Sequence, residues 1–380
     1  MKIGIDGRLG YKEGIGRYLF ELVENLAELA PDYRYILYFN AEHSDYYTQH
    51  APRRQNIEWR FIAGAAFRGR EQWNLIQAVK ADKVDLYHAT FEYGAPLWLD
   101  APLILTVHDA YFLPPAKSKE YFRSFSTYLY YQLMMAYGLV KAKRVITVSN
   151  FVRNKIIGHS AFYSKFKNKI SAVHNGVGSE FNLNGDDDAG ITGKYGLDRY
   201  FLYVGALTNH KNIFGLLSGY AYAVRQMPDC PRLAVAGKPN KSLWNLSELL
   251  EKQGIVDKVS FLGYVPNEEL PGLFRRALAF AFPSLHEGFG IPVLEAMACG
   301  TPVITSDRTA LPEVAGDAAL LVDPHSPEAI GNAMLNLCRD PALAAELRAK
   351  GLARAGQFSW RKMAAETLTL YRAVLSGSSH

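Results

Sequence analysis

The chain has 380 residues, which is too long for one ordinary domain and predicts two or three. Hydrophobic residues make up 49% and charged residues 21% of the sequence, which excludes disordered, collagen-like and fibrous proteins. The formal net charge is +5, and the three cysteines lie far apart without zinc-type spacing, which excludes a disulfide scaffold and favours a reducing compartment.

The N-terminal residues, MKIGIDGRLG, are not expected to form a secretory signal, because Asp6 and Arg8 interrupt the apolar run. The most apolar long stretch, residues 128–140, has thirteen residues. A helix that crosses a bilayer needs about 20. We therefore expect a soluble protein that at most visits a membrane surface.

Short apolar runs alternate with helical patterns along the first half of the chain. A helix is expected at residues 16–29, because the apolar residues there have helical spacing. Strands are expected at residues 2–6, 35–39, 57–61, 86–88, 103–108, 144–148 and 170–173. Strands separated by helices predict a parallel sheet with right-handed crossovers.

The pattern lapses at residues 182–199, which are rich in Gly and Asp, as linkers are. A second series of strands then follows, at residues 200–207, 232–237, 258–263, 279–284, 302–307 and 318–323. The sequence thus predicts two Rossmann-like α/β domains, residues 1–182 and 200–359, joined by a linker at 183–199. Two such domains facing each other would form one cleft, because ligands bind beyond the carboxyl ends of parallel strands.

The segment SLHEGFGIPVLEAMACGTP, residues 284–302, is the most informative part of the sequence. Its glycines let the backbone approach a bulky anion, and a helix that begins near Pro292 offers free N–H groups, which together suit a diphosphate. Glu287 and Glu295 are eight residues apart and suit pairs of hydroxyl groups on a sugar and a ribose. The simpler alternative is a glycine-rich turn with a Glu near a helix start.

The run EGFGIPVLE, followed by AMACGTPVI, resembles the retaining glycosyltransferases of family 4, which have the GT-B fold. The resemblance extends from MKIGID to the last helix, residues 360–376, which it implies packs back towards an acceptor-side N-terminal domain. It also implies that Glu287 contacts the donor hexose and Glu295 the ribose. The diphosphate and sugar would be held by the backbone of Gly288, Phe289, Gly290 and Ile291.

A second motif, VGALTNHKN at residues 204–212, follows the first strand of the second domain. Gly205 ends this strand, and the charge of Lys211 can neutralise a leaving diphosphate. The family usually supplies an Arg here as well, where this chain has Ala206. His210 or another Arg is left to compensate, and a solvated Lys at a helix start is the simpler alternative.

Three more places are candidates for the site on the strength of the resemblance. Gly14 and Gly16, in EGIGR between the first strand and helix, match a loop that reaches the donor phosphates or the acceptor. His108 matches a family His near the reaction centre, and Asp109 after it is a candidate acceptor contact, although a turn cap is simpler. Val265 matches the region that frames the nucleobase through its backbone.

Residues 117–169 hold eleven Lys or Arg and one acid, with seven aromatic residues between positions 121 and 137. This pattern suits an anionic surface, and a solvated basic helix face is an equally good explanation. We expect a lipid-linked diphosphate acceptor and peripheral binding to an anionic cytoplasmic membrane face, through Lys141, Lys143 and Arg144, and no binding of nucleic acid.

The sequence therefore predicts a retaining glycosyltransferase with His108, Lys211 and Glu287 as catalytic residues. Its N-terminal sequence, IGIDGR followed by GIGRY, resembles that of bacterial mannosyltransferases of O-antigen or exopolysaccharide assembly. GDP-mannose is therefore the first choice of donor, and UDP-glucose or another UDP-sugar is the next. No cofactor and no divalent metal are expected, because the DDD run at residues 186–188 falls in the linker. The alternatives are a sugar-nucleotide epimerase, a dinucleotide oxidoreductase and a non-catalytic nucleotide-sugar-binding protein.

Overall fold

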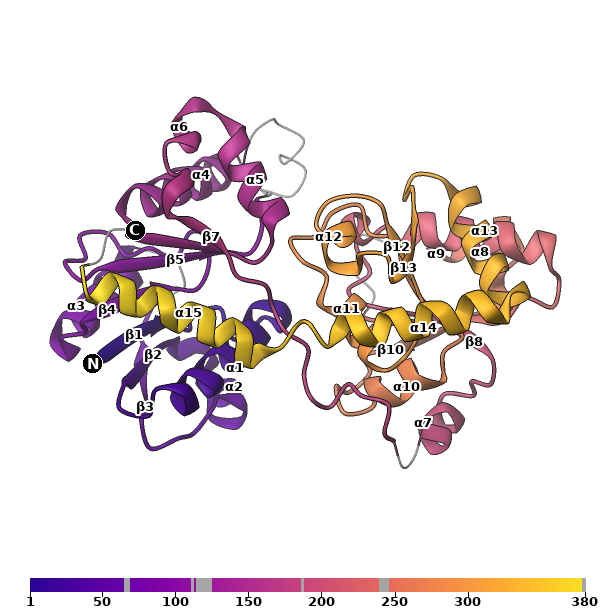
Figure 1. The fold of residues 1–380 in the computed structure, drawn as a ribbon, viewed down its shortest axis with the longest axis horizontal. Helices are drawn as coiled ribbons and strands as arrows, with labels where there is room; N and C mark the ends of the chain where they lie inside the picture. Colours follow the sequence, from indigo (N-terminus) through magenta and orange to yellow (C-terminus); the bar gives the residue numbers. More distant parts are fainter. Residues whose placement is uncertain (65–68, 111–112, 114–124, 186–187, 239–245, 378–380) are drawn as a thin grey trace. The chain divides into compact units, whose positions relative to one another are not determined.

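The computed structural model describes the chain apart from residues 65–68, 111–112, 114–124, 186–187, 239–245 and 378–380. Part of the basic segment and two residues of the DDD run therefore lie outside the described residues. The chain forms two compact units, Met1–Asn175 together with Trp360–His380, and Gly176–Ser359. Each unit has its own parallel sheet, and the last helix belongs to the first unit (Figure 1).

The first unit contains a seven-stranded sheet in the order β3-β2-β1-β4-β5-β6-β7, in which neighbouring strands are parallel. The central strands are buried, which is why they read as nearly continuous apolar runs. The strands are β1 (Lys2–Asp6), β2 (Arg34–Asn40), β3 (Ile57–Ile62), β4 (Leu86–Ala89), β5 (Leu103–Val107), β6 (Arg144–Thr147) and β7 (Ile170–Ala172).

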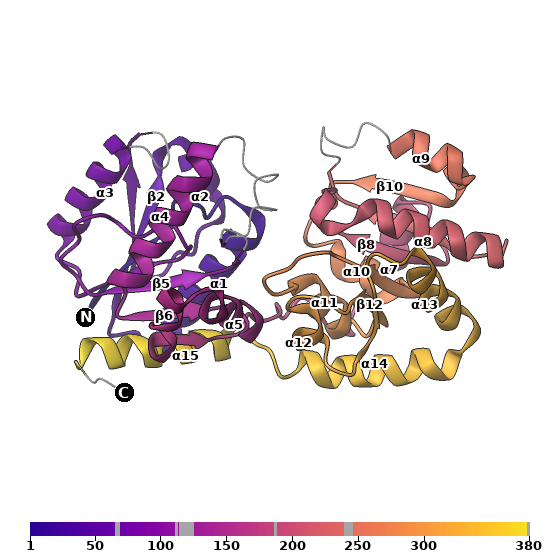
Figure 2. The same ribbon diagram turned by 90° about the horizontal axis from the view of Figure 1, so that it is seen from above.

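Helices cover this sheet on both sides. They are α1 (Glu13–Leu29), α2 (Ser44–His50), α3 (Gly69–Asp82), α4 (Phe125–Lys141), α5 (Asn150–His159), α6 (Ala161–Ser164) and α15 (Trp360–Leu375). The C-terminal helix α15 packs against α1, and Figure 2 shows α3 and α4 on the other side of the sheet. Helix α1 begins three residues before the expected start, so Gly14 and Gly16 lie in its first turn and not in a loop before it.

The second unit contains a six-stranded parallel sheet in the order β10-β9-β8-β11-β12-β13. Its strands are β8 (Tyr200–Val204), β9 (Arg232–Ala236), β10 (Val259–Gly263), β11 (Ala279–Phe282), β12 (Val303–Ser306) and β13 (Ala319–Val322). Each of them lies within a run that the sequence predicts to be a strand.

The helices of the second unit are α7 (Asp188–Lys194), α8 (Ile213–Gln226), α9 (Leu246–Gln253), α10 (Leu270–Arg276), α11 (Ile291–Ala298), α12 (Leu311–Ala315), α13 (Pro327–Arg339) and α14 (Pro341–Ala355). Helix α13 packs against α8, and α14 packs against α11. Local chemistry sets the helix starts: Ser326 and Asp340 accept N-cap hydrogen bonds, and a Pro follows each of them.

The expected linker at residues 183–199 differs in the structure. The second unit begins at Gly176, and helix α7 lies inside the expected linker. Arg275 of α10 holds this helix with hydrogen bonds of 2.7 and 2.6 Å to the two carboxylate oxygens of Asp188. The sequence pattern missed the helix because a partly buried ion pair, and not an apolar stripe, attaches it.

Each sheet has one point where the strand order reverses, between β1 and β4 in the first unit and between β8 and β11 in the second. In open parallel sheets, ligands bind beyond the carboxyl ends of the strands at such a reversal. The reversal between β1 and β4 is the first switch point, and the reversal between β8 and β11 is the second switch point. Every candidate catalytic residue follows one of these four strands or the neighbouring β5.

Candidate functional site

The connection after β8 is held in place by its own backbone. Gly205 has φ +151°, and a Cβ atom on Gly237 would lie 2.0 Å from the Gly205 carbonyl oxygen, so the two glycines permit a close backbone approach. A short 3-10 helix, Asn209–Lys211, follows. Lys211 therefore leaves a tightly packed loop and not a freely moving one.

Asn212 fastens this loop to the neighbouring strand ends. It has left-handed backbone geometry, with φ +59°. Its side-chain amide donates hydrogen bonds of 3.0 Å to the Pro283 carbonyl and 2.6 Å to the Pro324 carbonyl. Since Pro283 directly follows β11, the loop that carries Lys211 is fixed against the end of that strand.

The connection after β11 meets the same loop. Ser284 Oγ and the Leu285 backbone N–H donate to the His210 carbonyl, at 2.9 and 2.8 Å. The Glu287 backbone N–H donates to Thr309 Oγ1 at 3.2 Å. These bonds fix the backbone on both sides of the second switch point and place Glu287 opposite Lys211.

Lys211 and Glu287 form an ion pair at the second switch point, although they are 76 positions apart in sequence. The Lys211 ammonium donates to both carboxylate oxygens, at 2.6 and 2.9 Å. The side chains are 21% and 11% exposed, so solvent reaches both of them. The ammonium also lies 5.3 Å from the centre of the Phe282 ring. The structure thus brings together two residues that the sequence places in one site.

Helix α11 begins beside this pair. Gly290 precedes it with φ +110°, and a Cβ atom there would lie 2.6 Å from a Leu311 methyl group. A larger residue would meet both backbone strain and a clash. Pro292 occupies the first turn, as the sequence predicts. The free N–H groups of this turn and the helix dipole favour a bound anion.

The other residues that were expected to bind the donor differ in how far their side chains are buried. Glu295 is only 4% exposed, and Phe289 is a core residue whose ring packs 6.0 Å from that of Phe358. Val265 is 5% exposed. Backbone groups are therefore what Phe289 and Val265 can offer a ligand. Gly288 and Ile291 are half-buried, and His210 is held by Thr208 Oγ1, 3.2 Å from its Nδ1.

His108 follows β5 in the first unit and is held by the loop after β4. Its Nε2 donates to the Thr90 carbonyl at 2.8 Å, which fixes the tautomer with a proton on Nε2, because a carbonyl can only accept. Burial lowers the pKa of His108 to about 4, and its hydrogen bond to Thr90 and the charge of Asp109 partly oppose this. His108 is therefore neutral near pH 7 and keeps Nδ1 as an acceptor.

Asp109, Gly14 and Gly16 have distinct environments. Asp109 is half-buried directly after His108. A Cβ atom on Gly16 would lie 2.1 Å from the Gly10 carbonyl oxygen, so Gly16 is needed for packing inside the first turn of α1. No atom lies within 4 Å of the Cβ position of Gly14, so it faces open space. Of the two glycines, Gly14 is the one that a ligand can approach.

Sequence reasoning missed the charged residues of the first switch point. Arg8 is fully buried and donates hydrogen bonds to Asp6, to both Glu71 carboxylate oxygens and to the Gly94 carbonyl. Glu92, in the loop after β4, is 5% exposed. The signal available was the position of Arg8 and Glu92 in the connections that follow predicted strands. Both strands were predicted, but these two residues were not assigned to the site.

The basic residues expected at a membrane surface lie at the end of α4. Lys141 and Lys143 are exposed and line a shallow hollow of about 230 Å³ together with the loop at residues 99–103. Arg144 begins β6 and is half-buried. None of the described helices has the length and apolar character that a membrane crossing requires.

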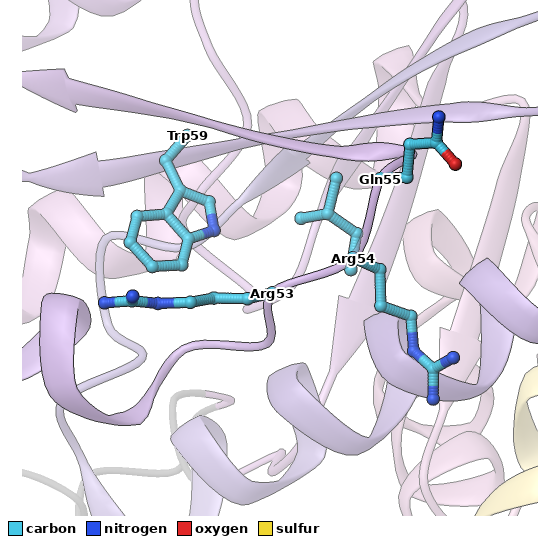
Figure 3. Close-up of a pocket in the computed structure, with 5 residues that line it drawn as sticks. Arg53, Arg54, Gln55 and Trp59 are labelled. Atoms are coloured by element: carbon cyan, nitrogen blue, oxygen red, sulfur yellow. The ribbon is translucent and has the colours of Figure 1, made fainter.

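A larger open hollow, of about 620 Å³, lies at the start of β3, outside the candidate site (Figure 3). The Arg53 guanidinium stacks 5.3 Å from the centre of the Trp59 ring. Arg54 points away from this stack and forms ion pairs with Glu24 and Glu28. No residue that the sequence analysis singled out lines this hollow.

Comparison with known proteins identifies the family. The model of Glycosyltransferase Family 4 matches residues 12–181, and that of Glycosyl transferases group 1 matches residues 185–354. The O-antigen chain mannosyltransferase B of Escherichia coli is 32% identical over 385 residues, which cover 94% of this chain and 96% of that protein. The chain belongs to the family 4 glycosyltransferases. This glycosyltransferase is thus an enzyme, as the sequence motifs predict.

Solved structures confirm the fold. Sucrose-phosphate synthase from Thermosynechococcus elongatus superimposes with a TM-score of 0.79 at 20% identity, over 100% of both chains. Anabaena HepE, in complex with UDP and glucose, gives 0.77 at 19% identity, over 98% of this chain and 100% of that one. The glycosyltransferase has the expected GT-B fold of two Rossmann-like units, with its C-terminal helix in the first unit.

Proposed function

We propose that the chain transfers mannose from GDP-mannose to a saccharide carried on a lipid diphosphate, during assembly of a bacterial surface polysaccharide. Two relatives named as O-antigen chain mannosyltransferases, one from Escherichia coli and one from Salmonella typhimurium, support mannose as the transferred sugar and the O-antigen type of product. The latter is 31% identical over 61% of this chain. The observation that carries the proposal is the Lys211–Glu287 pair beside the start of α11.

The pair and the helix start offer separate groups to the parts of a nucleotide sugar. Lys211 and the first N–H groups of α11 bear positive charge and suit the diphosphate. Glu287 suits the hydroxyl groups of the hexose, and the buried Glu295 those of the ribose. Before the donor binds, Glu287 neutralises Lys211. Once Lys211 turns to the diphosphate, its charge stabilises the leaving group as negative charge develops there.

We propose transfer with retention of configuration and without a metal ion. The bond between the sugar carbon and the phosphate oxygen breaks, and its electron pair stays on the phosphate. The acceptor oxygen bonds to the same face of the sugar, and its proton passes to the leaving phosphate. Lys211 and the α11 N–H groups supply the positive charge that a divalent cation supplies in other enzymes.

Turnover of GDP-mannose by the full-length protein tests this function. With a methyl mannobioside acceptor and EDTA, we expect GDP release and, by NMR, one new α-mannosidic linkage. Lys211→Ala and Glu287→Ala should each lower turnover about a hundredfold or more. Lys252→Ala and Glu268→Ala, at exposed positions of the same unit, are the matched controls.

Other outcomes of this assay would replace the proposal. Transfer from UDP-glucose but not from GDP-mannose would show that UDP-glucose, the second choice, is the donor. Tight binding of a nucleotide sugar without turnover would favour a non-catalytic binding protein, an alternative that Ala206 in place of the usual Arg keeps open. Activity that EDTA abolishes and Mg²⁺ restores would contradict the metal-free mechanism.

We further propose that the first unit binds an anionic membrane surface peripherally, on its cytoplasmic side. Helix α4 exposes a row of apolar side chains, with Leu129 44%, Leu133 60% and Val140 54% exposed. Trp98 is 72% exposed, and its backbone N–H is held by Tyr137 of the same helix. Apolar and indole groups next to lysines are typical of surfaces that enter the headgroup layer.

Vesicle sedimentation tests this surface. We expect binding to vesicles with anionic lipid at low salt and a loss of about tenfold for Trp98→Ala combined with Lys141→Glu and Lys143→Glu. Trp73→Ala combined with Lys252→Glu changes another exposed indole, 59% exposed, and an exposed lysine elsewhere, so it should bind like the wild type. Equal binding by both variants would contradict the proposed surface.

A further inference from the structure

The loop after β4, at the first switch point, holds a buried carboxyl group that the donor site does not use. Glu92 is 5% exposed, and within the described part of the chain its Oε2 has no hydrogen-bond partner. Buried polar atoms in native proteins are nearly always paired, and each exception calls for an explanation, such as a catalytic role or a bound partner. A structural role for Glu92 would leave this orphan unexplained.

The surroundings of Glu92 show what its carboxyl can do. Burial raises its pKa to about 8, and the charge of Asp109 adds to this, while the Glu92 and His108 backbone N–H groups and Lys12 oppose it. The tyrosines Tyr93 and Tyr131 also lie near it. Glu92 is thus protonated near pH 7, and a neutral carboxyl both donates and accepts one hydrogen bond, as a sugar hydroxyl does.

The loop that carries Glu92 is rigidly placed. Thr90 donates through Oγ1 to the Asp6 carbonyl at 2.5 Å and accepts the His108 bond, and Arg8 donates to the Gly94 carbonyl at 3.1 Å. These bonds tie the loop to the ends of β1 and β5. The charged groups that act on Glu92 are the half-buried Asp109, after β5, and the exposed Lys12, just before α1, so Glu92 lies near the carboxyl edge of the sheet.

We infer that Glu92 is an acceptor-binding residue, whose Oε2 hydrogen-bonds a hydroxyl group of the acceptor saccharide at the first switch point. The inference rests on the proposed function. A neutral carboxyl suits a hydroxyl and lacks the positive charge that holds a phosphate, so Glu92 is unsuited to the diphosphate. The groups suited to the donor belong to the second unit, where Lys211 and Glu287 form their pair.

Calorimetry on the full-length protein tests the inference with two ligands, GDP alone and methyl mannobioside with GDP bound. The variants are Glu92→Leu, which cannot hydrogen-bond, and Glu92→Gln, which keeps a donor and an acceptor. We expect Glu92→Leu to weaken the mannobioside about tenfold or more, and Glu92→Gln to weaken it less. GDP binding should stay within about twofold, since uncoupled sites behave independently.

A matched control and a stability measurement separate this role from a structural one. Gln72 of α3 is 8% exposed, and both its side-chain polar atoms also lack partners in the described structure. Gln72→Leu should leave both affinities unchanged. The unfolding midpoint of Glu92→Gln should stay close to that of the wild type, because the amide keeps an oxygen that can accept from the Glu92 and His108 backbone N–H groups.

The outcomes distinguish the two proposals. Unchanged mannobioside affinity in Glu92→Leu, or no mannobioside binding by the GDP-bound wild type, would overturn the role of Glu92. Weaker GDP binding with unchanged mannobioside binding would also overturn the role of Glu92 in acceptor binding, and would assign Glu92 to the donor site. A wild type that binds no GDP would overturn the proposed donor, and titration of the mannobioside alone would still decide Glu92.

Discussion

The two switch points of this glycosyltransferase have the same topology and use charge in different ways. At the first, Arg8, Asp6 and Glu71 are fully buried and pair with one another. At the second, Lys211 and Glu287 form a single pair that solvent reaches. Both sets of charges gather around the carboxyl ends of central parallel strands.

This difference separates holding a loop from binding a ligand. A buried network cannot open without leaving charges unpaired in the interior, so it fixes the connections after β1 and β4. A partly exposed pair can exchange partners at low cost, so Lys211 can turn from Glu287 to an arriving diphosphate. The same parallel-sheet edge can therefore carry a structural or a functional charge cluster, and burial decides which.

The sharpest way to break this comparison is to remove one cation from each switch point. Arg8→Ala should lower the free energy of unfolding by about 3–5 kcal/mol, because it leaves Asp6 and Glu71 buried and unpaired. Lys211→Met should lower it by about 1 kcal/mol or less. Chemical denaturation measures both changes.

The surface ion pairs of Arg54 provide the control. Arg54 lies between Glu24 and Glu28 and is 36% exposed, so Arg54→Ala should change the free energy of unfolding by less than about 1 kcal/mol. If Arg8→Ala lowered the free energy of unfolding as little as Arg54→Ala does, the buried charges of the first switch point would not stabilise the fold as described.

A second prediction concerns sensitivity to acid, which His88 should confer on the first unit. Burial lowers the pKa of His88 to about 3, and its ring nitrogens lie 2.7 Å from Tyr371 Oη and Thr106 Oγ1. A neutral His in the folded state and a protonated one in the unfolded state mean that stability is complete above about pH 6.5 and falls as the pH is lowered towards 3.

The expected loss from His88 is on the order of 3 kcal/mol between pH 7 and 4. Scanning calorimetry across this range measures it, with His88→Gln as the variant that removes the titrating group. The stability of His88→Gln should depend less steeply on pH than that of the wild type. An equally steep curve would show that other groups cause the acid sensitivity.

The smallest expected effect concerns the two glycines of α1. Gly16→Ala should destabilise the protein by about 1–3 kcal/mol, because its Cβ would meet the Gly10 backbone. Gly14→Ala meets no atom and should stabilise the helix by about 0.5–1 kcal/mol. Thermal unfolding of both variants checks this. Equal effects would mean that the first turn does not pack as described.

Much of the fold could be predicted from the sequence, because buried parallel strands leave clear apolar runs. The motifs around Lys211 and Glu287, with the family resemblance, placed both residues in one donor site, and the structure shows that they follow the neighbouring strands β8 and β11. Helix α7 escaped this reasoning because the Arg275–Asp188 pair that holds it joins residues 87 positions apart. No local pattern marks such a contact.

The first switch point was predicted less well for the same reason. In the sequence, Arg8 was noted only because it interrupts the apolar N-terminal run. Its partner Glu71 lies 63 positions away. Glu92 carried no motif, and its unpaired oxygen is visible only once the loops around it are placed. Gly16 was assigned to a ligand because the approach of Gly10 could not be foreseen from spacing.

The most direct test of the donor site is calorimetry in EDTA with two ligands, GDP and GDP-mannose, and two variants, Lys211→Met and Glu287→Gln. Lys211→Met should weaken both ligands by about tenfold or more, because both carry the diphosphate. Glu287→Gln should weaken GDP-mannose without weakening GDP, because only the former carries the hexose. If both variants bound both ligands as tightly as the wild type, the second switch point would not be the donor site.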